Sequence, residues 1–359
     1  MAPSPAAAAP TLAEAAPRPY IWAVLAVAVA TQAAGSVVAQ GVYVLVPFWR
    51  DAFGVSLASA SLAVTVMNGA QIATMFALGR VIDRHGERRV VGLAMLGMAL
   101  AMAAAAAFAD GLPALLLCMA FLGATYAAVQ PGGTRAIMRW FPPRHRGLAT
   151  GFRQAAVPFG TMVAAALLPL LAIRHGWHAA AWAGAGASLL GALLFWGLYR
   201  EGGEVAGKAD QPLPLRALIR AMGQEPSFWP VLRLGITMSA FQFTLTAHVI
   251  GFMAEGLGLG LVTAASLFAG VQLVGIPGRV LLPWLSDRLR PERRVQSFGI
   301  VSLLGAAAAA ALAVMPTGAP LPVIAAILVV LGLFGIGWFP LGATTTQSWP
   351  RSRRCRYTP

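Results

Sequence analysis

Two arginines stand out inside long apolar runs of the sequence, where an ionisable side chain is costly. Arg153 falls near the start of one run and Arg279 near the end of another, and neither run has an acidic residue at its middle. An arginine at the centre of a membrane-spanning helix costs roughly 2.5 to 3.5 kcal/mol and is usually functional. Because a guanidinium group matches a carboxylate, the two arginines predict a site for an organic anion. The alternative is that each extends to lipid headgroups, which we prefer for Arg135, nearer a membrane surface.

Other polar side chains within the apolar runs are candidates for the same site. A histidine exchanges a proton at about pH 6 to 7, so His248 also suggests a coupling proton. Each of these side chains could instead form a hydrogen bond between helices or lie at the membrane interface. The residues expected to contact substrate are Arg153, Arg279, Gln40, Gln130, Gln154 and His248.

The composition indicates that lipid is the solvent of this protein. Of its 359 residues, 58% are hydrophobic and 11% are charged, whereas soluble domains are roughly half apolar and a quarter charged. The formal net charge is +14, but the arginines form short clusters rather than a continuous basic face, which argues against a nucleic-acid partner. We therefore expect two partners, the lipid bilayer and a small-molecule substrate.

The sequence offers little support for an enzyme or a metal site. Cys118 and Cys355 give neither a disulfide framework nor the spacing of metal ligands. No histidine lies beside a serine or cysteine in the setting of a nucleophile. We expect no catalytic residues, no metal and no cofactor.

Ten apolar stretches are long enough to cross a bilayer. A core about 30 Å thick needs roughly 20 apolar residues in a helix, because every backbone N–H and C=O group must be paired within the segment. The sequence therefore predicts an all-α, polytopic membrane helix bundle. The expected spans are residues 20–48, 57–79, 90–109, 112–138, 148–173, 179–199, 228–253, 261–285, 295–315 and 320–344.

The charges between the spans predict their orientation. Connections after even-numbered spans are rich in arginine, and those after odd-numbered spans carry few charges. Since short cytoplasmic loops hold the excess of Lys and Arg, both ends of the chain are expected in the cytoplasm. Lys208 is the single lysine among 26 basic residues, which is typical of GC-rich coding and suggests a bacterial inner membrane. The expected organisation is a disordered tail (1–19), a six-helix half (20–199), a central cytoplasmic loop (200–226), a four-helix half (227–346) and a basic tail (347–359).

A charged motif occurs twice. The stretch GRVIDRHGERR, residues 79–89, follows the second span, and GRVLLPWLSDRLRPERR, residues 278–294, follows the eighth. An offset of six helices keeps both copies on one face of the membrane, which predicts two parallel six-helix repeats, the second incomplete. The alternative is an inverted repeat of five helices each, which would place equivalent loops on opposite faces.

The first copy resembles the signature loop between the second and third helices of the major facilitator superfamily. Gly79, Asp83, Arg84, Gly86 and Arg88 match its pattern G-x-x-x-D-R-x-G-x-R, although residue 87 is a glutamate where a basic residue is usual. The stretch RWFPPRHRGLATGFRQAAVPFG, residues 139–160, resembles the monocarboxylate and organic-anion branch. The resemblance implies a secondary transporter that works by alternating access, with its substrate site between two halves.

In that superfamily the motif holds the cytoplasmic gate shut. Asp83 could act as a latch, since a carboxylate can accept backbone N–H bonds from the N-terminus of a neighbouring helix. The alternative is that the basic residues only set topology and bind anionic headgroups. The resemblance assigns the gate to Gly79, Asp83, Arg84, Gly86, Arg88, Asp287 and Arg288.

The sequence departs from the superfamily in two places. Twelve spans are usual, but the apolar runs stop at ten, and the residues after Gln347, SWPRSRRCRYTP, resemble an out-of-frame or truncated product. Met119 stands where many members carry an arginine ahead of a glycine in helix four, so the proton-linked role of that arginine is not carried over. A transport-inactive fragment or a membrane sensor is therefore the alternative to a transporter.

Overall fold

The computed structural model describes residues 18–201, 220, 223–224, 228–289 and 293–342. The expectations for the two tails and the central loop lie almost entirely outside these residues. Within them the chain is helical, with short turns and no strand. The α-helices are α2 (Arg18–Phe53), α3 (Leu57–His85), α4 (Glu87–Phe108), α5 (Leu112–Tyr126), α6 (Val129–Trp140), α7 (Pro143–His175), α8 (Trp177–Leu198), α10 (Phe228–Gly251), α11 (Leu261–Leu289), α12 (Arg294–Ala313) and α13 (Leu321–Leu331). Two π-helical turns, Phe252–Gly256 and Gly332–Ile336, follow α10 and α13.

Nine helical segments of the described residues are long and apolar enough to cross a membrane. A tenth is the pair Phe228–Thr246 and His248–Gly256, which passes the same test together but is bent by 44°. The prediction of an all-α polytopic bundle with about ten spans is confirmed.

Several helices extend beyond the apolar runs that predicted them. The second span was expected to end at residue 79, but α3 continues to His85, because helix formation requires backbone pairing and not apolar side chains. The expected span 112–138 is built from two helices, α5 and α6, which meet at Ala127 and Ala128. Pro131 lies in the first turn of α6, where its missing N–H removes no intrahelical hydrogen bond.

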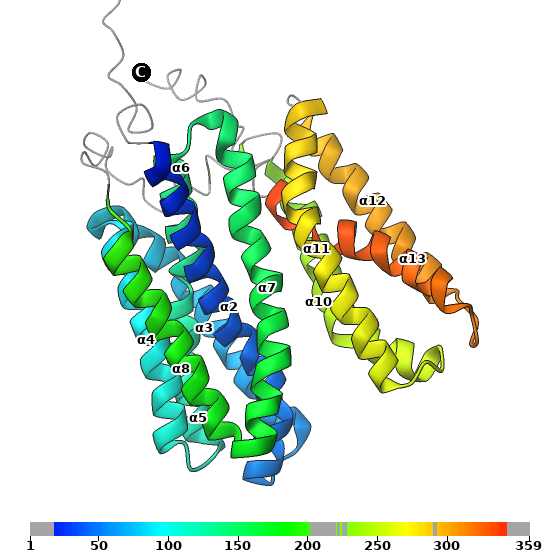
Figure 1. Ribbon diagram of the computed structural model, residues 1–359, viewed down its shortest axis with the longest axis horizontal. Helices are drawn as coiled ribbons and strands as arrows, with labels where there is room; N and C mark the ends of the chain where they lie inside the picture. The colour runs from blue at the N-terminus through cyan, green and yellow to red at the C-terminus, as the bar shows by residue number, and fades with distance from the viewer. Residues whose placement is uncertain (1–17, 202–219, 221–222, 225–227, 290–292, 343–359) are drawn as a thin grey trace, which may run out of the picture. The chain divides into compact units, whose positions relative to one another are not determined.

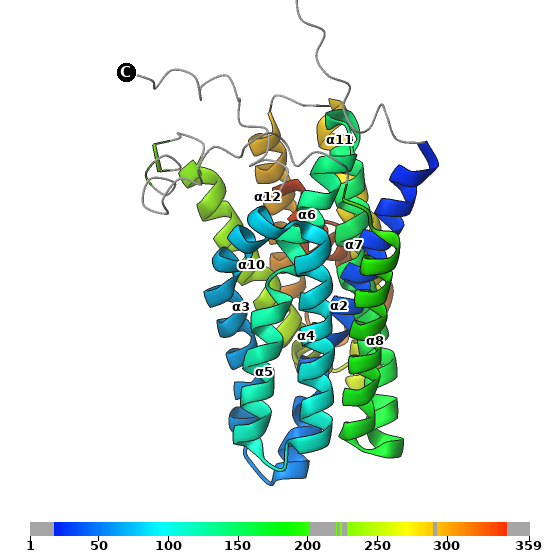
Figure 2. The ribbon, with the colours of Figure 1, turned by 90° about the vertical axis from the view of Figure 1, so that its left-hand side faces the viewer.

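The chain divides into two compact units. The first comprises Met1–Ala149 and Gly160–Val205, and the second comprises Thr150–Phe159 and Ala206–Pro359, so that α7 contributes to both. In the first unit α4 packs along α8 and α3 packs along α5, as Figures 1 and 2 show. In the second unit α11 packs against α13 and the π-helical turn that follows it.

Single glycines form two of the corners between helices. Gly86 joins α3 to α4 with φ +82° and ψ 156°, and Gly176 joins α7 to α8 with φ +82° and ψ 160°. Side chains with a Cβ rarely adopt this conformation, so glycine is required at both corners. Each pair of helices is therefore connected through one residue.

Glycines also allow close helix crossings in the first unit. A Cβ on Gly123 of α5 would overlap the backbone carbonyl oxygen of Met67 on α3. A Cβ on Gly160 of α7 would lie 2.6 Å from the carbonyl oxygen of Ala33 on α2. Such close approach is how membrane helices gain packing energy where lipid competes for apolar contacts.

We expect Gly123→Ala to destabilise the first unit by about 1 to 3 kcal/mol, because the methyl group must push α3 and α5 apart. The matched control is Gly186→Ala on α8, where no atom lies within 4 Å of an added Cβ. That control should be neutral or slightly stabilising, since alanine favours a helix over glycine by up to about 1 kcal/mol. Thermal unfolding in detergent measures both, and equal midpoints would contradict the close crossing.

Candidate functional site

A fully buried carboxylate lies at the start of α4. Glu87 is 0% exposed, its Oε1 lies 3.0 Å from Nε of Arg139, and its Oε2 lies 3.4 Å from Nε of Arg135. The Tyr199 hydroxyl donates to Oε1 at 2.6 Å. Burial, and then the neighbouring carboxylate, raise the pKa of the Tyr199 phenol above its usual value, so its O–H remains a donor. We call these four residues the Glu87 cluster; it ties α4 to α6 and to the end of α8.

The motif aspartate is connected to the same cluster. Asp83 Oδ1, on α3, pairs with Nη1 of Arg135. Arg135 therefore contacts two carboxylates, one on α3 and one on α4. The expectation that Arg135 extends to lipid headgroups is wrong, because nearby carboxylates hold its guanidinium group instead.

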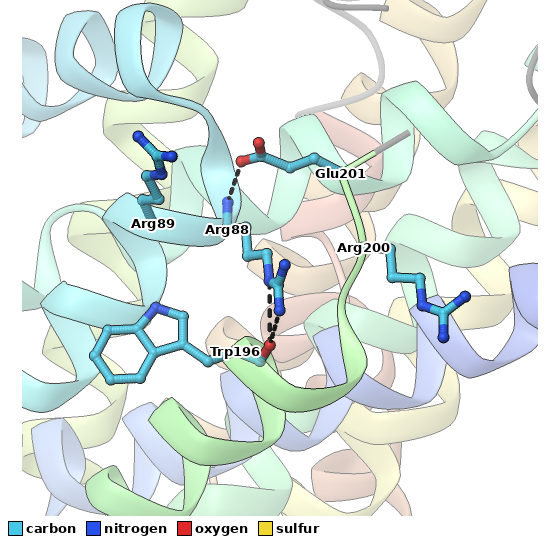
Figure 3. Close-up of a pocket in the computed structure, with 5 residues that line it drawn as sticks. All are labelled: Arg88, Arg89, Trp196, Arg200 and Glu201. Carbon is cyan, nitrogen blue, oxygen red and sulfur yellow. Dashed lines mark hydrogen bonds between the residues drawn. The ribbon is translucent and has the colours of Figure 1, made fainter. Parts of the chain in front are cut away.

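The N-terminus of α4 is bound by Glu201 and not by Asp83. The backbone N–H of Arg88 donates to Glu201 Oε1 at 2.8 Å (Figure 3). The Arg88 guanidinium donates from Nε to the carbonyl oxygen of Trp196 at 3.1 Å, and its Nη2 donates to the same oxygen. The N-terminus of α4 is thus capped by a carboxylate that follows α8, and the contact of Asp83 with a neighbouring helix terminus stays a prediction.

The other motif residues lie where their helices end. Gly79 lies on α3, Arg84 is exposed in the last turn of α3, and Gly86 forms the corner before α4. In the second copy, the Arg288 guanidinium lies 5.2 Å from the ring centroid of Trp284 on α11. Asp287 lies in the same helix, and its side chain is outside the described residues.

A buried polar cluster lies within the second unit. Arg279 is 4% exposed and donates from Nη1 to the carbonyl oxygen of Gln154 at 3.0 Å and from Nε to that of Ile336 at 3.2 Å. A Cβ on Gly151 would lie 2.8 Å from the carbonyl oxygen of Arg279, so glycine permits this close approach of α7 and α11. Arg153 is 1% exposed and adjoins Gln154 on α7. Three of the six predicted substrate residues are therefore buried, and two of them, Arg279 and Gln154, are in contact.

The other three predicted substrate residues lie on α2, α6 and α10. Gln40 on α2 and Gln130 on α6 are half-buried and belong to the first unit, and His248 is exposed on α10. In the part of the chain that the structure describes, no three His, Cys, Asp or Glu side chains come together as metal ligands would.

Most of the Glu87 cluster was not predicted from the sequence. Arg135 and Arg139 are four residues apart, the spacing that puts two side chains on one helix face, and this signal was available. Glu87 was noted only as a departure from the motif. Tyr199 and Glu201 carried no local signal, because their partners on α4 are separated from them by 112 and 113 residues.

The described residues hold nine helices able to cross a membrane, or ten if the bent pair forms one span, which defines a multi-pass membrane protein. The chain belongs to the Major Facilitator Superfamily, whose family model matches residues 18–358.

The relatives of this chain carry transporter names. An uncharacterized MFS-type transporter of Mycobacterium tuberculosis is 31% identical over 306 residues, which cover 81% of this chain and 63% of the relative. The hexuronate transporter of Escherichia coli K12 is 25% identical over 160 residues, covering 44% of this chain and 37% of that protein. The gallate transporter of Pseudomonas putida is 24% identical over 278 residues, covering 68% and 59%. The chain thus spans less than two thirds of the length of these relatives.

The solved structures share the fold. A bacterial homolog of the human lysosomal transporter Spinster, in an inward-facing and unoccupied conformation, matches with a TM-score of 0.66 and 18% identity. The match covers 94% of this chain and 78% of that protein.

Proposed function

We propose that this protein is a secondary active transporter that moves a small organic anion by alternating access. Its proposed location is a bacterial inner membrane, with both ends of the chain in the cytoplasm. Membership of the superfamily supports transport. The burial of two guanidinium groups in membrane-spanning helices, Arg153 at 1% exposed and Arg279 at 4%, supports an anionic substrate.

The buried side chains of Arg279, Arg153 and Gln154 have the chemistry to bind a carboxylate. The two carbonyl contacts of Arg279 orient its guanidinium group. Arg153 adds a second positive charge from α7, and Gln154 adds an amide. Gallate and the hexuronates, for which two relatives are named, are small molecules that each carry one carboxylate.

Counterflow in sealed proteoliposomes tests this function. Vesicles loaded with unlabelled gallate or glucuronate should accumulate the labelled compound from outside, and vesicles loaded with uncharged glucose should not accumulate labelled glucose. Only a carrier exchanges solute across a sealed bilayer in this way. Exchange no faster than in protein-free vesicles, for every solute, would contradict transport and favour the inactive fragment or sensor.

We propose that the motif loop is the gate and that Asp83 contributes to it. Asp83→Asn should slow counterflow several-fold with little loss of protein from the membrane fraction. Its ion pair with Arg135 is largely exposed, with side-chain exposures of 59% and 29%, so its loss should cost at most about 1 kcal/mol of stability. The matched control is Asp51→Asn, which removes an exposed ion pair with Arg50 outside the motif. Wild-type counterflow by Asp83→Asn would reject the gate.

A further inference from the structure

A cavity of about 400 Å³ opens in the first unit, between the start of α4 and the residues that follow α8. It is lined by Arg88, Arg89, Trp196, Arg200 and Glu201, which Figure 3 shows, and we call it the Arg88 pocket. None of these residues belongs to the proposed substrate site.

Contacts within the protein fix the walls of the Arg88 pocket. The Trp196 indole lies so close to the α4 backbone that a Cβ on Gly92 would overlap the ring. The Trp196 carbonyl oxygen accepts from the Arg88 guanidinium, and Glu201 accepts from the Arg88 backbone N–H. Three of the five lining residues therefore hold one another in place, and the pocket is largely formed before a ligand arrives.

The pocket carries an excess of positive charge. Arg89 and Arg200 lie on either side of Arg88 with their side chains directed apart (Figure 3), and both side chains are exposed. The Arg200 guanidinium lies 5.7 Å from the ring centroid of Tyr20. Three arginines against one glutamate leave two positive charges. Guanidinium groups bind the oxygens of phosphate with favourable geometry.

The pocket also lies where two membrane spans end. The span Glu87–Phe108 begins beside it, and the span Trp177–Leu198 ends beside it. Below it, Leu93 follows Arg89 by one helical turn and is 60% exposed, and Leu193 precedes Trp196 by one turn and is 57% exposed. Tryptophan at this level and apolar side chains beneath it are typical of a site at the lipid headgroups.

We propose that the Arg88 pocket binds a phosphate group, a chemistry that both phospholipid headgroups and soluble phosphate esters provide. A headgroup could place its phosphate among the arginines and its acyl chains along the exposed leucines of α4 and α8. A soluble ester would use the arginines alone. Glu201 opposes the ligand's charge and so limits its affinity.

The test compares the wild-type chain with the double variant Arg89→Gln/Arg200→Gln. Both side chains are exposed, and the substitution removes only the contact of Arg200 with the Tyr20 ring, so thermal midpoints should fall only slightly. The matched control is Arg233→Gln, which removes an exposed arginine whose Nε lies 3.4 Å from the carbonyl oxygen of Trp229 on α10. Each protein is extracted from vesicles of equal phosphatidylglycerol and phosphatidylcholine, and native mass spectrometry measures the retained lipid. A second arm records the shift in thermal midpoint with inorganic phosphate and with glycerol phosphate.

The double variant should retain several-fold less phosphatidylglycerol than the wild type and Arg233→Gln, and Glu201→Gln should retain more. Equal lipid retention, with stabilisation by glycerol phosphate or phosphate in the wild type but not in the double variant, would identify a soluble phosphate as the ligand. Equal lipid retention together with equal responses to soluble phosphate in all variants would overturn the proposal.

Discussion

Glu87→Ala is expected to destabilise the first unit by about 3 kcal/mol or more, because it leaves the guanidinium groups of Arg135 and Arg139 without their shared buried carboxylate. Glu87→Gln should reduce the stability of the first unit almost as much, since an amide restores the shape of the side chain but not its charge. Denaturant unfolding in detergent micelles measures the change in free energy.

Three further variants make the result specific to the Glu87 cluster. Tyr199→Phe removes only the hydrogen bond to Glu87 and should cost less, about 1.5 kcal/mol. The double variant Glu87→Gln/Arg139→Gln should recover part of the loss, because it removes both charges of one pair. Glu255→Ala removes an exposed glutamate and should be neutral. If Glu87→Ala unfolds like Glu255→Ala, the cluster does not stabilise the unit.

Arg153→Gln is expected to raise the carboxylate concentration for half-maximal counterflow roughly 10- to 100-fold, because a hydrogen bond to a charged group is worth about 1.5 to 3 kcal/mol. The proposed contact joins the buried Arg153 guanidinium to the substrate carboxylate. Arg153→Lys should fall between the glutamine variant and the wild type, since it keeps the charge but loses the planar pair of donors.

The matched control for Arg153 lies on the same helix. Arg174 is exposed in the last turn of α7, so Arg174→Gln removes an equal charge outside the proposed site. It should leave half-saturation unchanged. An Arg153→Gln protein that folds normally and exchanges carboxylates with wild-type half-saturation would reject Arg153 as a substrate residue.

The sequence predicted the spans well because lipid imposes one physical demand, a continuous apolar helix, that can be read locally. It placed the ends less well, as at His85, because hydropathy reports the hydrocarbon boundary and helices continue past it. The motif glycine at residue 86 was identified by resemblance, and its φ of +82° now explains the requirement.

The sequence could not predict which charges pair. Asp83, Arg135 and Arg88 were all noticed, but their partners depend on how α3, α4, α6 and α8 cross. The helix cap by Glu201 spans 113 residues, a separation at which no spacing rule applies. Arg279 shows the same limit, since it donates to backbone carbonyls of Gln154 and Ile336, groups that every residue possesses.

The one-glycine corners at Gly86 and Gly176 restrict how this sequence can change in length. Loop tips normally accommodate insertions and deletions. A corner of one residue cannot, because it has no other residues whose conformation could change. Adding or removing a residue inside the adjoining helix would rotate the remainder of that helix by about 100° and turn the buried face of α4 or α8 toward lipid. Natural variation in length should therefore be excluded from residues 83–90 and 173–180, and a tag inserted there should abolish folding.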